Sequence, residues 1–290
     1  MIKNGIAVVT VIYEKGLPFF KDYFASLENQ KNKNFDLLLF GGGISKKSAQ
    51  ALRNHMNGRK SVNYQLIDLG KLPLNVIWTK VMAFLIRSKY EKIIFADLDD
   101  YFRSDRVAIL AAQLNKSPLV FHDLNLFYDR GDKIVHSYFK GKMPARIDWR
   151  FILDKNCLGL GNSAIRRELL FPIRIPKEIK AIDWYLFMNL MLKRGVKARF
   201  IPKGLTYYRQ HVGNISGISD LTSDRILNAL EIKRRHYYWL LRKFRKNHLL
   251  LQMYQAIKIL TDNFKKDAYL KRMQKEFSGK RTFWWEYARV

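Results

Sequence analysis

The sequence has one cysteine and few acidic residues, and both shortages narrow the classes of protein it can be. Cys157 alone excludes an internal disulfide, a redox pair of cysteines and a cysteine-rich zinc site, and it favours a reducing compartment. Only 25 Asp and Glu stand against 53 Lys and Arg among the 290 residues, so the formal net charge is +28. This excess indicates an anionic partner: nucleic acid, an acidic membrane surface or a phosphorylated substrate.

Long hydrophobic runs are also missing, since no stretch approaches the roughly 18 apolar residues of a membrane span. The apolar run at Ile6–Tyr13 is rich in β-branched residues and is followed by Glu14 and Lys15, where a signal peptide would have small residues. We interpret it as a buried strand. The sequence therefore predicts a cytoplasmic protein, peripheral on the inner face of the cell membrane if its basic residues bind lipid.

Strand-like and helix-like segments alternate over the first hundred residues. This alternation predicts an α/β fold with a mainly parallel sheet and helices on both faces. Ligands bind such sheets beyond the carboxyl ends of the strands. The strands expected here are 6–12, 35–40, 64–69 and 92–96, and the helices start near Gly16 and cover 45–56 and 74–87.

The rest of the chain is less regular, and its last part is strongly basic. Residues 221–290 contain 17 Lys or Arg, 6 Asp or Glu and no proline. We expect a catalytic domain at 1–219 and a basic helical extension at 220–290. The expected elements are strands at 119–123, 126–128, 134–139, 196–201 and 205–210, a turn at 129–132, and helices at 182–194, 223–246, 248–264 and 266–277.

Three carboxylates, Asp97, Asp99 and Asp100, directly follow the fourth expected strand. Asp97 and Asp99 are two residues apart, so in an extended loop their side chains point to one side. Oxygen ligands of this kind suit Mg²⁺ or Mn²⁺ bound together with a substrate diphosphate. The alternative is an acidic turn that caps the helix beginning near Ser104.

Two further residues gain meaning from their order along the chain. Asp183 lies at the start of an expected helix, where it is either a functional carboxylate or an N-cap. His211 follows an expected strand, and it is either a ligand or an ordinary structural histidine. A glycine-rich loop at 158–162 lies between the acidic cluster and Asp183.

In this order, the motifs resemble those of the inverting family 2 glycosyltransferases of the GT-A fold. Residues 7–13 are similar to the family's first strand, 95–100 to its metal-binding DxD motif and 159–162 to its glycine-rich loop. Residues 182–184 occupy the place of its xED motif. The block at 208–217, with His211, Asn214 and Gly217, is similar to the closing motif of rhamnosyltransferase-like members that act on surface polysaccharides or lipopolysaccharide.

The resemblance implies roles for named residues. Asp183 is the expected general base, and Asp97, Asp99 and His211 are the expected metal ligands. The donor is a UDP- or dTDP-sugar, and the acceptor is a hydroxyl of a cell-surface glycan or a lipid-linked oligosaccharide. The residues expected to bind the nucleotide-sugar are Thr10, Tyr13, Glu14, Gly41, Gly42, Lys80, Asp97, Leu98, Gly161, Asn162 and Arg209.

The chain departs from the family pattern at three places. Gly41-Gly42-Gly43 stands where the family has acidic residues that read the base, and these glycines either admit the nucleotide or only turn the chain. Lys80 falls at about the place where the family has an arginine, and it is either a phosphate contact or a solvated surface lysine. Ile182 replaces the family's glutamate.

The basic extension leaves the function open. Its interleaved cations and aromatic residues, including Phe283, Trp284, Trp285 and Tyr287, suit an anionic membrane surface or a helical extension packed on the catalytic domain. Nucleic acid is a weaker expectation, because no known binding module is present. The alternatives to a glycosyltransferase are a nucleic-acid-binding basic α/β protein and a non-catalytic glycosyltransferase-like subunit of a polysaccharide assembly complex.

Overall fold

The computed structural model describes residues 5–57, 61–128, 134–211, 221–262, 266–280 and 282–289. The chain divides into two compact units. The first comprises Met1–Arg146, Leu160–Arg174 and Val196–Gln210, and the second comprises Ile147–Gly159, Ile175–Gly195 and His211–Val290. The basic tail therefore shares its unit with two segments from the middle of the chain. The boundary expected at residues 219 and 220 lies outside the described residues and stays a prediction.

The parallel half of the sheet follows the predicted alternation of strands and helices. Its strands pair side by side in the order β3-β2-β1-β4. β1, β2 and β4 are almost continuously apolar and buried, as expected for parallel strands covered on both faces. All four predicted strands are confirmed, as β1 (Ile6–Ile12), β2 (Asp36–Gly41), β3 (Asn63–Asp68) and β4 (Lys92–Phe95).

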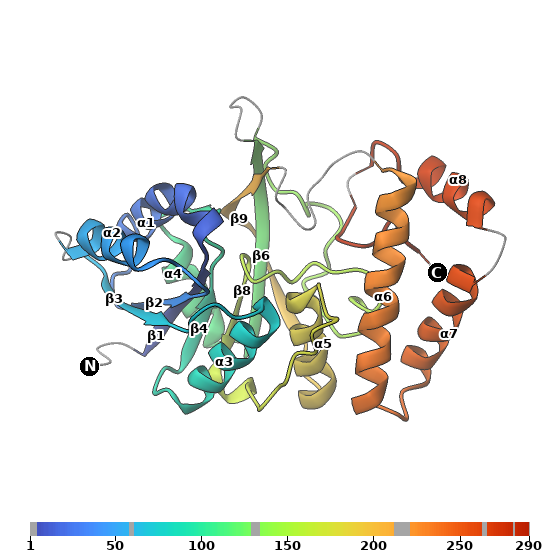
Figure 1. Cartoon of the computed structure of the whole chain (residues 1–290), viewed down its shortest axis with the longest axis horizontal. Coiled ribbons are helices and arrows are strands. Elements are labelled where there is room, and N and C mark those ends of the chain that lie inside the picture. The colour runs from blue at the N-terminus through green and yellow to red at the C-terminus, as the bar shows by residue number, and fades with distance from the viewer. Residues whose placement is uncertain are drawn as a thin grey trace. The chain divides into compact units, whose positions relative to one another are not determined.

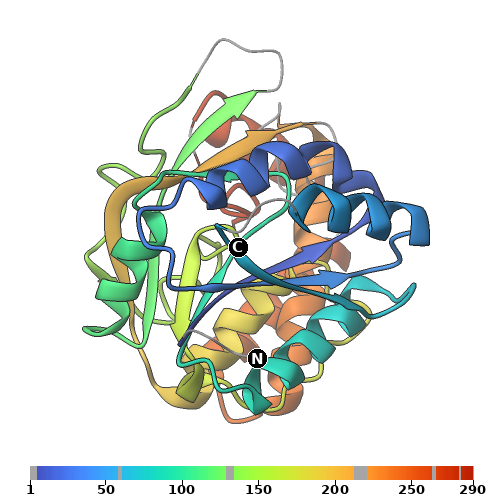
Figure 2. The same cartoon turned by 90° about the vertical axis from the view of Figure 1, so that its left-hand side faces the viewer.

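Helices cover both faces of this half, as Figures 1 and 2 show. Alternate residues of β1 point to opposite faces, so Val8 and Ile12 join the core beneath α1, α2 and α4. On the other face, Trp78 and Phe84 of α3 pack against Phe95 and Phe40. The helices are α1 (Phe20–Glu28), preceded by a 3₁₀ turn at Glu14–Phe19, α2 (Lys46–Asn57), α3 (Leu74–Arg87) and α4 (Arg106–Leu114).

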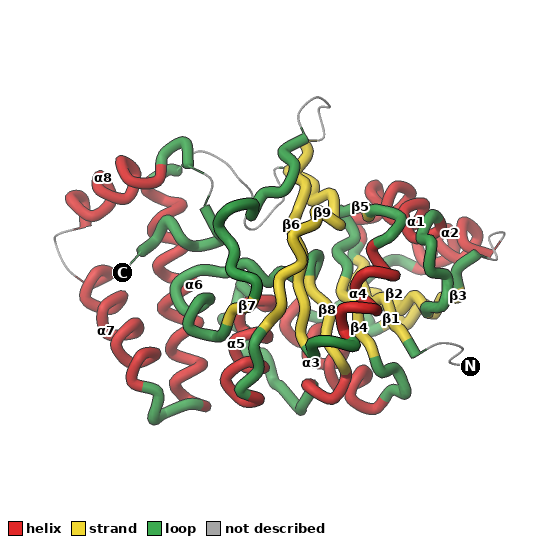
Figure 3. Tube along the Cα trace, turned by 180° about the vertical axis from the view of Figure 1, so that it is seen from behind, coloured by secondary structure: helices red, strands yellow, loops and turns green. Residues whose placement is uncertain are grey.

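The second half of the sheet mixes strand directions. β8 (Ser163–Arg166) is antiparallel to β4 and β6 (Leu119–Tyr128), while β6 and β9 (Ala198–Gln210) run parallel over most of their length. Figure 3 shows these strands side by side. The short strands β5 (Tyr101–Phe102) and β7 (Arg146–Ile147) both pair with β9. A 3₁₀ turn at Arg167–Leu169 follows β8.

Two sequence expectations are wrong in this half. Two pairs of expected strands each form one strand: 119–123 and 126–128 lie in β6, and 196–201 and 205–210 lie in β9. The reason is that polar Asp123 and Asn125 are satisfied inside the sheet, at an irregularity opposite Gly204. The strand expected at 134–139 is absent: only Val135 bridges to β6, and Ser137 has a left-handed φ of 51°. The turn expected at 129–132 lies outside the described residues.

The second unit is helical. α5 (Ile182–Arg194) matches its predicted range and ends at Gly195, whose φ of 63° supplies the left-handed cap. α6 (Ser223–Lys243) packs with α7 (His248–Asp262) and α8 (Lys266–Phe277), close to the three predicted tail helices. Within the described residues, no helix is both long enough and apolar enough to cross a lipid bilayer.

Candidate active site

The acidic cluster forms a short loop at the carboxyl end of β4. Leu98 is buried, whereas Asp97 and Asp99 on either side of it keep partial contact with solvent. The Ala96 amide donates to the Val9 carbonyl, which extends the β1–β4 pairing to the base of the loop. The buried leucine thus anchors the loop and leaves two carboxylates at the surface, at the edge where ligands bind such sheets.

Two of the carboxylates converge on the glycine-rich loop. A Cβ atom added to Gly161 would lie 2.8 Å from Asp97 Oδ2 and 2.9 Å from Asp100 Oδ2. Asp100 is fully buried, and its Oδ1 accepts the Arg209 amide, while its Oδ2 has no hydrogen-bond partner among the described residues. Burial, and then the charges of Asp99 and Asp97, raise the pKa of Asp100 well above its ordinary value. The structure therefore brings Asp97 and Asp100 to Gly161, where sequence reasoning paired Asp97 with Asp99.

This cluster fits a divalent cation in its donor chemistry. It offers carboxylate oxygens to a hard ion, including one buried oxygen that accepts no hydrogen bond from the described part of the chain. Among the described residues, no three His, Cys, Asp or Glu side chains gather into a set that could hold a metal alone. Mg²⁺ in nucleotide sites takes one or two carboxylates and completes its shell with water and phosphate oxygens, which suits this loop. His211, the third expected ligand, follows β9 and belongs to the second unit.

A buried arginine that sequence reasoning missed holds the two loops. Arg106 is fully buried and donates to the carbonyls of Phe95 at 2.6 Å and of Gly161 at 3.1 Å. Its Nε donates to His122 Nε2 at 3.3 Å, and burial keeps that histidine neutral by lowering its pKa. Thr206 donates a second hydrogen bond to the Gly161 carbonyl. The available signal was an arginine at the start of an otherwise apolar helix, α4.

Two other expected donor-binding residues contribute to the framework of the same site. Arg209 donates through Nε to the Asp99 carbonyl at 2.8 Å and lies between the rings of Phe19 and Phe127. Its outer nitrogen pairs with Asp22 at 3.0 Å, so this guanidinium braces the acidic loop. Asn162 is buried, and its side-chain amide donates to the His122 carbonyl.

The expected residues at the end of β1 have unequal surroundings. Thr10 is buried in the core, and its hydroxyl bonds Tyr23 at 2.5 Å. Tyr13 is exposed at 37%. Burial of its phenol and the charges of Asp99 and Asp97 raise its pKa, and the effect of these charges indicates that the ring lies near the acidic loop. Glu14 accepts hydrogen bonds from Ser48 in the first turn of α2 and from Ser45 just before it, and these lower its pKa. Of the three, Tyr13 is the one placed beside the carboxylates.

The glycines after β2 have structural reasons of their own. The Gly42 amide donates to the Ile12 carbonyl, and a Cβ atom there would lie 2.6 Å from Ile77 of α3. Gly43 has a left-handed φ of 75°, and Gly41 ends the strand. These observations account for the turn, and the nucleotide contact of Gly41 and Gly42 stays a prediction. Lys80 lies on α3 and is exposed.

Asp183 lies in the first turn of α5, but Ala181 is the N-cap. Its Oδ1 accepts the Trp184 amide at 2.7 Å, and its Oδ2 accepts Asn156 Nδ2 at 3.2 Å. Burial raises the pKa of Asp183 to about 6, although the two hydrogen bonds oppose the shift. A carboxyl group with a pKa near neutral is suited to accept a proton during a reaction.

The fold is similar to solved glycosyltransferase structures. S. aureus TarS 1–349 superposes with a TM-score of 0.60 and 16% identity, over 93% of this chain and 77% of that one. The chain has the GT-A fold. The mannosyltransferase PcManGT from Pyrobaculum calidifontis, solved with GDP-Man and Mn²⁺, gives 0.58 and 12%, over 83% and 65%. GalNAc-T7, solved with UDP, GalNAc and Mn²⁺, gives 0.52 and 12%, over 79% and 47%. No protein-family model matches the sequence, and no curated protein matches it.

Proposed function

We propose that the protein is a metal-dependent inverting glycosyltransferase that moves a sugar from a nucleotide-sugar to a hydroxyl group. The observation that carries this proposal is the convergence of Asp97 and Asp100 on Gly161 at the carboxyl edge of a GT-A sheet. Similar structures were solved with UDP-GlcNAc, UDP and GDP-Man, which supports a nucleotide-sugar donor. From the sequence resemblance, we propose UDP- or dTDP-sugar as the donor and a cell-surface glycan or lipid-linked oligosaccharide as the acceptor.

In the proposed reaction, the acceptor oxygen attacks the anomeric carbon as Asp183 takes the proton of the hydroxyl group. The new carbon–oxygen bond forms on the side of the anomeric carbon opposite its bond to the diphosphate. That bond breaks, the nucleoside diphosphate leaves with the electron pair, and the configuration at the anomeric carbon therefore inverts. Asp97 and Asp99, with Asp100 beside them, would hold Mg²⁺ or Mn²⁺, and the bound ion would supply positive charge against the departing nucleoside diphosphate. Arg209 and Arg106 keep the acidic loop and Gly161 in place.

A screen of nucleotide-sugars for thermal stabilisation, with and without Mn²⁺, tests the donor and the metal together. A ligand at about 100 times its dissociation constant adds roughly 2.7 kcal/mol of stability. We expect at least one donor to stabilise the protein only with metal, and Asp99→Ala to abolish that effect. Metal-dependent binding that survives in folded Asp99→Ala would reject the metal site. Donor binding without transfer to any acceptor would favour the non-catalytic subunit.

We also propose that the turn between α6 and α7 attaches the enzyme to an anionic membrane surface, near a lipid-linked acceptor. Arg245 and Lys246 in this turn and Arg242 at the end of α6 are exposed, next to the exposed side chains of Leu249 and Leu251 at the start of α7. Cations beside apolar side chains suit the headgroup region of such a bilayer. Of the aromatic residues near the end of the chain, three do not contribute, because the side chains of Phe283, Trp285 and Tyr287 are buried in the second unit.

A further inference from the structure

The hydrogen bond from Asn156 to Asp183 comes from a side chain that is itself fixed. Asn156 is fully buried, and its Oδ1 accepts the Leu158 amide at 3.1 Å. Its Nδ2 donates both to the Leu158 carbonyl at 3.1 Å and to Asp183 Oδ2 at 3.2 Å. The side chain cannot rotate without losing the bonds to Leu158. The donor that faces Asp183 is therefore preorganised.

The backbone of Asn156 is held by the end of the chain. Its amide donates to the Trp284 carbonyl at 2.8 Å, and the Trp284 amide donates back to the Asn156 carbonyl at 3.1 Å. These reciprocal bonds form an antiparallel bridge between residues far apart in sequence. The neighbouring side chains of Phe283 and Phe151 also pack edge to face, with ring centroids 5.9 Å apart. The last described segment, 282–289, thus contacts the residue that contacts Asp183.

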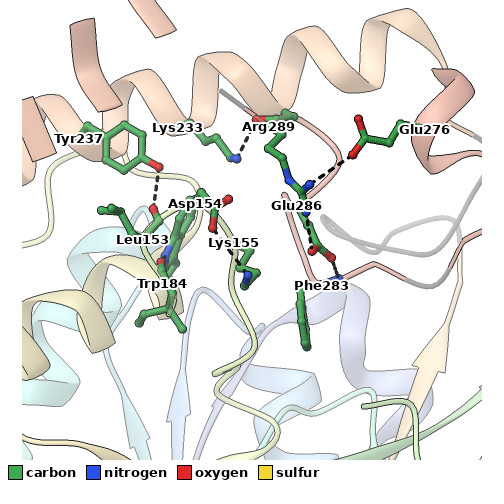
Figure 4. A network of polar contacts seen from close by, with 12 residues as sticks. Leu153, Asp154, Lys155, Trp184, Lys233, Tyr237, Glu276, Phe283, Glu286 and Arg289 are labelled. Atoms are coloured by element: carbon green, nitrogen blue, oxygen red, sulfur yellow. Dashed lines mark hydrogen bonds and ion pairs between the residues drawn. The ribbon is translucent and has the colours of Figure 1, made fainter. Parts of the chain in front are cut away.

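Helix α6 also contacts the loop that contains Asn156, and Figure 4 shows the hydrogen bond between Tyr237 and Leu153. The Tyr237 hydroxyl donates to the Leu153 carbonyl at 2.6 Å. The indole of Trp184, the residue after Asp183, donates to the Ile152 carbonyl at 2.7 Å and stacks on His236 with centroids 4.1 Å apart. Because α6 holds both the loop and Trp184, it fixes the loop relative to the start of α5.

One buried lysine joins α6 to the final segment. Lys233 is fully buried and donates to the Ala288 carbonyl at 2.7 Å (Figure 4). A cation is rarely placed in a protein interior, where desolvation is costly. Here the charges of Asp154 and Glu286 partly offset that cost. This lysine is therefore a structural tie and is not available to a membrane.

We infer that Asn156 is a positioning residue for the Asp183 carboxylate, and that α6 with residues 282–289 forms the scaffold that holds it. The inference rests on the proposed role of Asp183 as general base. It gives the basic tail a second role in transfer, besides the proposed membrane contact. The tail orders the loop that carries Asn156. Without the tail, the side-chain amide of Asn156 would no longer be held against Asp183.

Asn156→Leu tests the positioning role, because leucine has nearly the shape of asparagine but no donor. Loss of the amide removes a hydrogen bond to the charged form, so we expect the pKa of Asp183 to rise above its value of about 6. Carboxyl-carbon NMR of aspartate-labelled protein reads this value directly, and the signal missing in Asp183→Asn identifies the residue. We expect kcat to fall about tenfold or more with donor KM nearly unchanged. An unchanged pKa in folded Asn156→Leu would overturn the inference.

Lys233→Met tests the scaffold with the full chain, and Lys271→Met is its matched control. Both variants replace one lysine of the tail by methionine, but Lys271 is exposed on α8. We expect Lys233→Met to raise the pKa of Asp183 and lower kcat, and Lys271→Met to change neither. Equal behaviour of the two variants would overturn the scaffold. The two claims can fail separately. Wild-type transfer by Asp183→Asn would reject Asp183 as the general base. An unchanged Asp183 pKa in the NMR titration would reject the positioning role of Asn156.

Discussion

The contact between Gly161 and the acidic loop makes a strong prediction for Gly161→Ala. The added methyl carbon would lie 2.8 Å from Asp97 Oδ2 and 2.9 Å from Asp100 Oδ2, about half an ångström inside ordinary contact. The glycine loop cannot retreat easily, because Arg106 and Thr206 both bond the Gly161 carbonyl. Overpacking of this kind costs about 1–3 kcal/mol. The carboxylates must therefore move, and we expect metal-dependent donor affinity to fall tenfold or more.

Calorimetric titration with UDP or the best donor from the screen, with and without Mn²⁺, measures this loss. Gly5→Ala is the control, because a Cβ atom there has no neighbour closer than 4.0 Å. We expect Gly5→Ala to bind like the unmodified protein. If folded Gly161→Ala keeps the full metal-dependent affinity, the acidic loop beside Gly161 is not the donor site.

Two further predictions concern stability and membranes. The pKa of Asp183 in the folded protein, about 6, lies above its ordinary value, so ionisation of this group lowers stability as the pH rises from about 4 to 6. Asp183→Asn removes that cost, at most about 3 kcal/mol and about 1–2 after allowance for partial exposure. Urea unfolding at pH 4 and pH 8 checks this, and an equal effect at both pH values contradicts it. Joint replacement of Arg242, Arg245 and Lys246 by glutamine should weaken binding to anionic vesicles in sedimentation assays, most at low salt. Unchanged binding there would reject the membrane surface.

The parallel half of the fold was predictable, because its signals are local. β1 and β2 are continuous apolar runs, and Gly195 ends α5 where only a left-handed residue fits. The mixed half was harder. Polar Asp123 and Asn125 break the apolar pattern of β6, and their partners, the Phe139 amide and the Gly204 carbonyl, lie far along the chain.

The carboxylates of the candidate site could be located from the sequence, whereas the residues that support them could not. A cluster such as Asp97–Asp100 stands out in a basic sequence, since like charges gather where a cation relieves their repulsion. Arg106 and Asn156 act through backbone carbonyls and a single amide, which leave no spacing pattern in the sequence. The buried contacts of the tail could not be predicted for a related reason. Its cations and aromatic residues have the composition of a membrane contact, yet Lys233 and Phe283 are buried by contacts that composition does not reveal.

Asp183→Asn is the sharpest test of glycosyl transfer with Asp183 as the general base. Donor affinity and turnover are measured on the same folded protein, with the nucleotide-sugar that the screen identifies and Mn²⁺. Asparagine keeps the shape of the side chain but cannot accept the acceptor's proton at neutral pH. We predict unchanged donor affinity and a fall in turnover of roughly 10²–10⁴-fold. Wild-type turnover in Asp183→Asn would rule out Asp183 as the general base and assign that role to another residue.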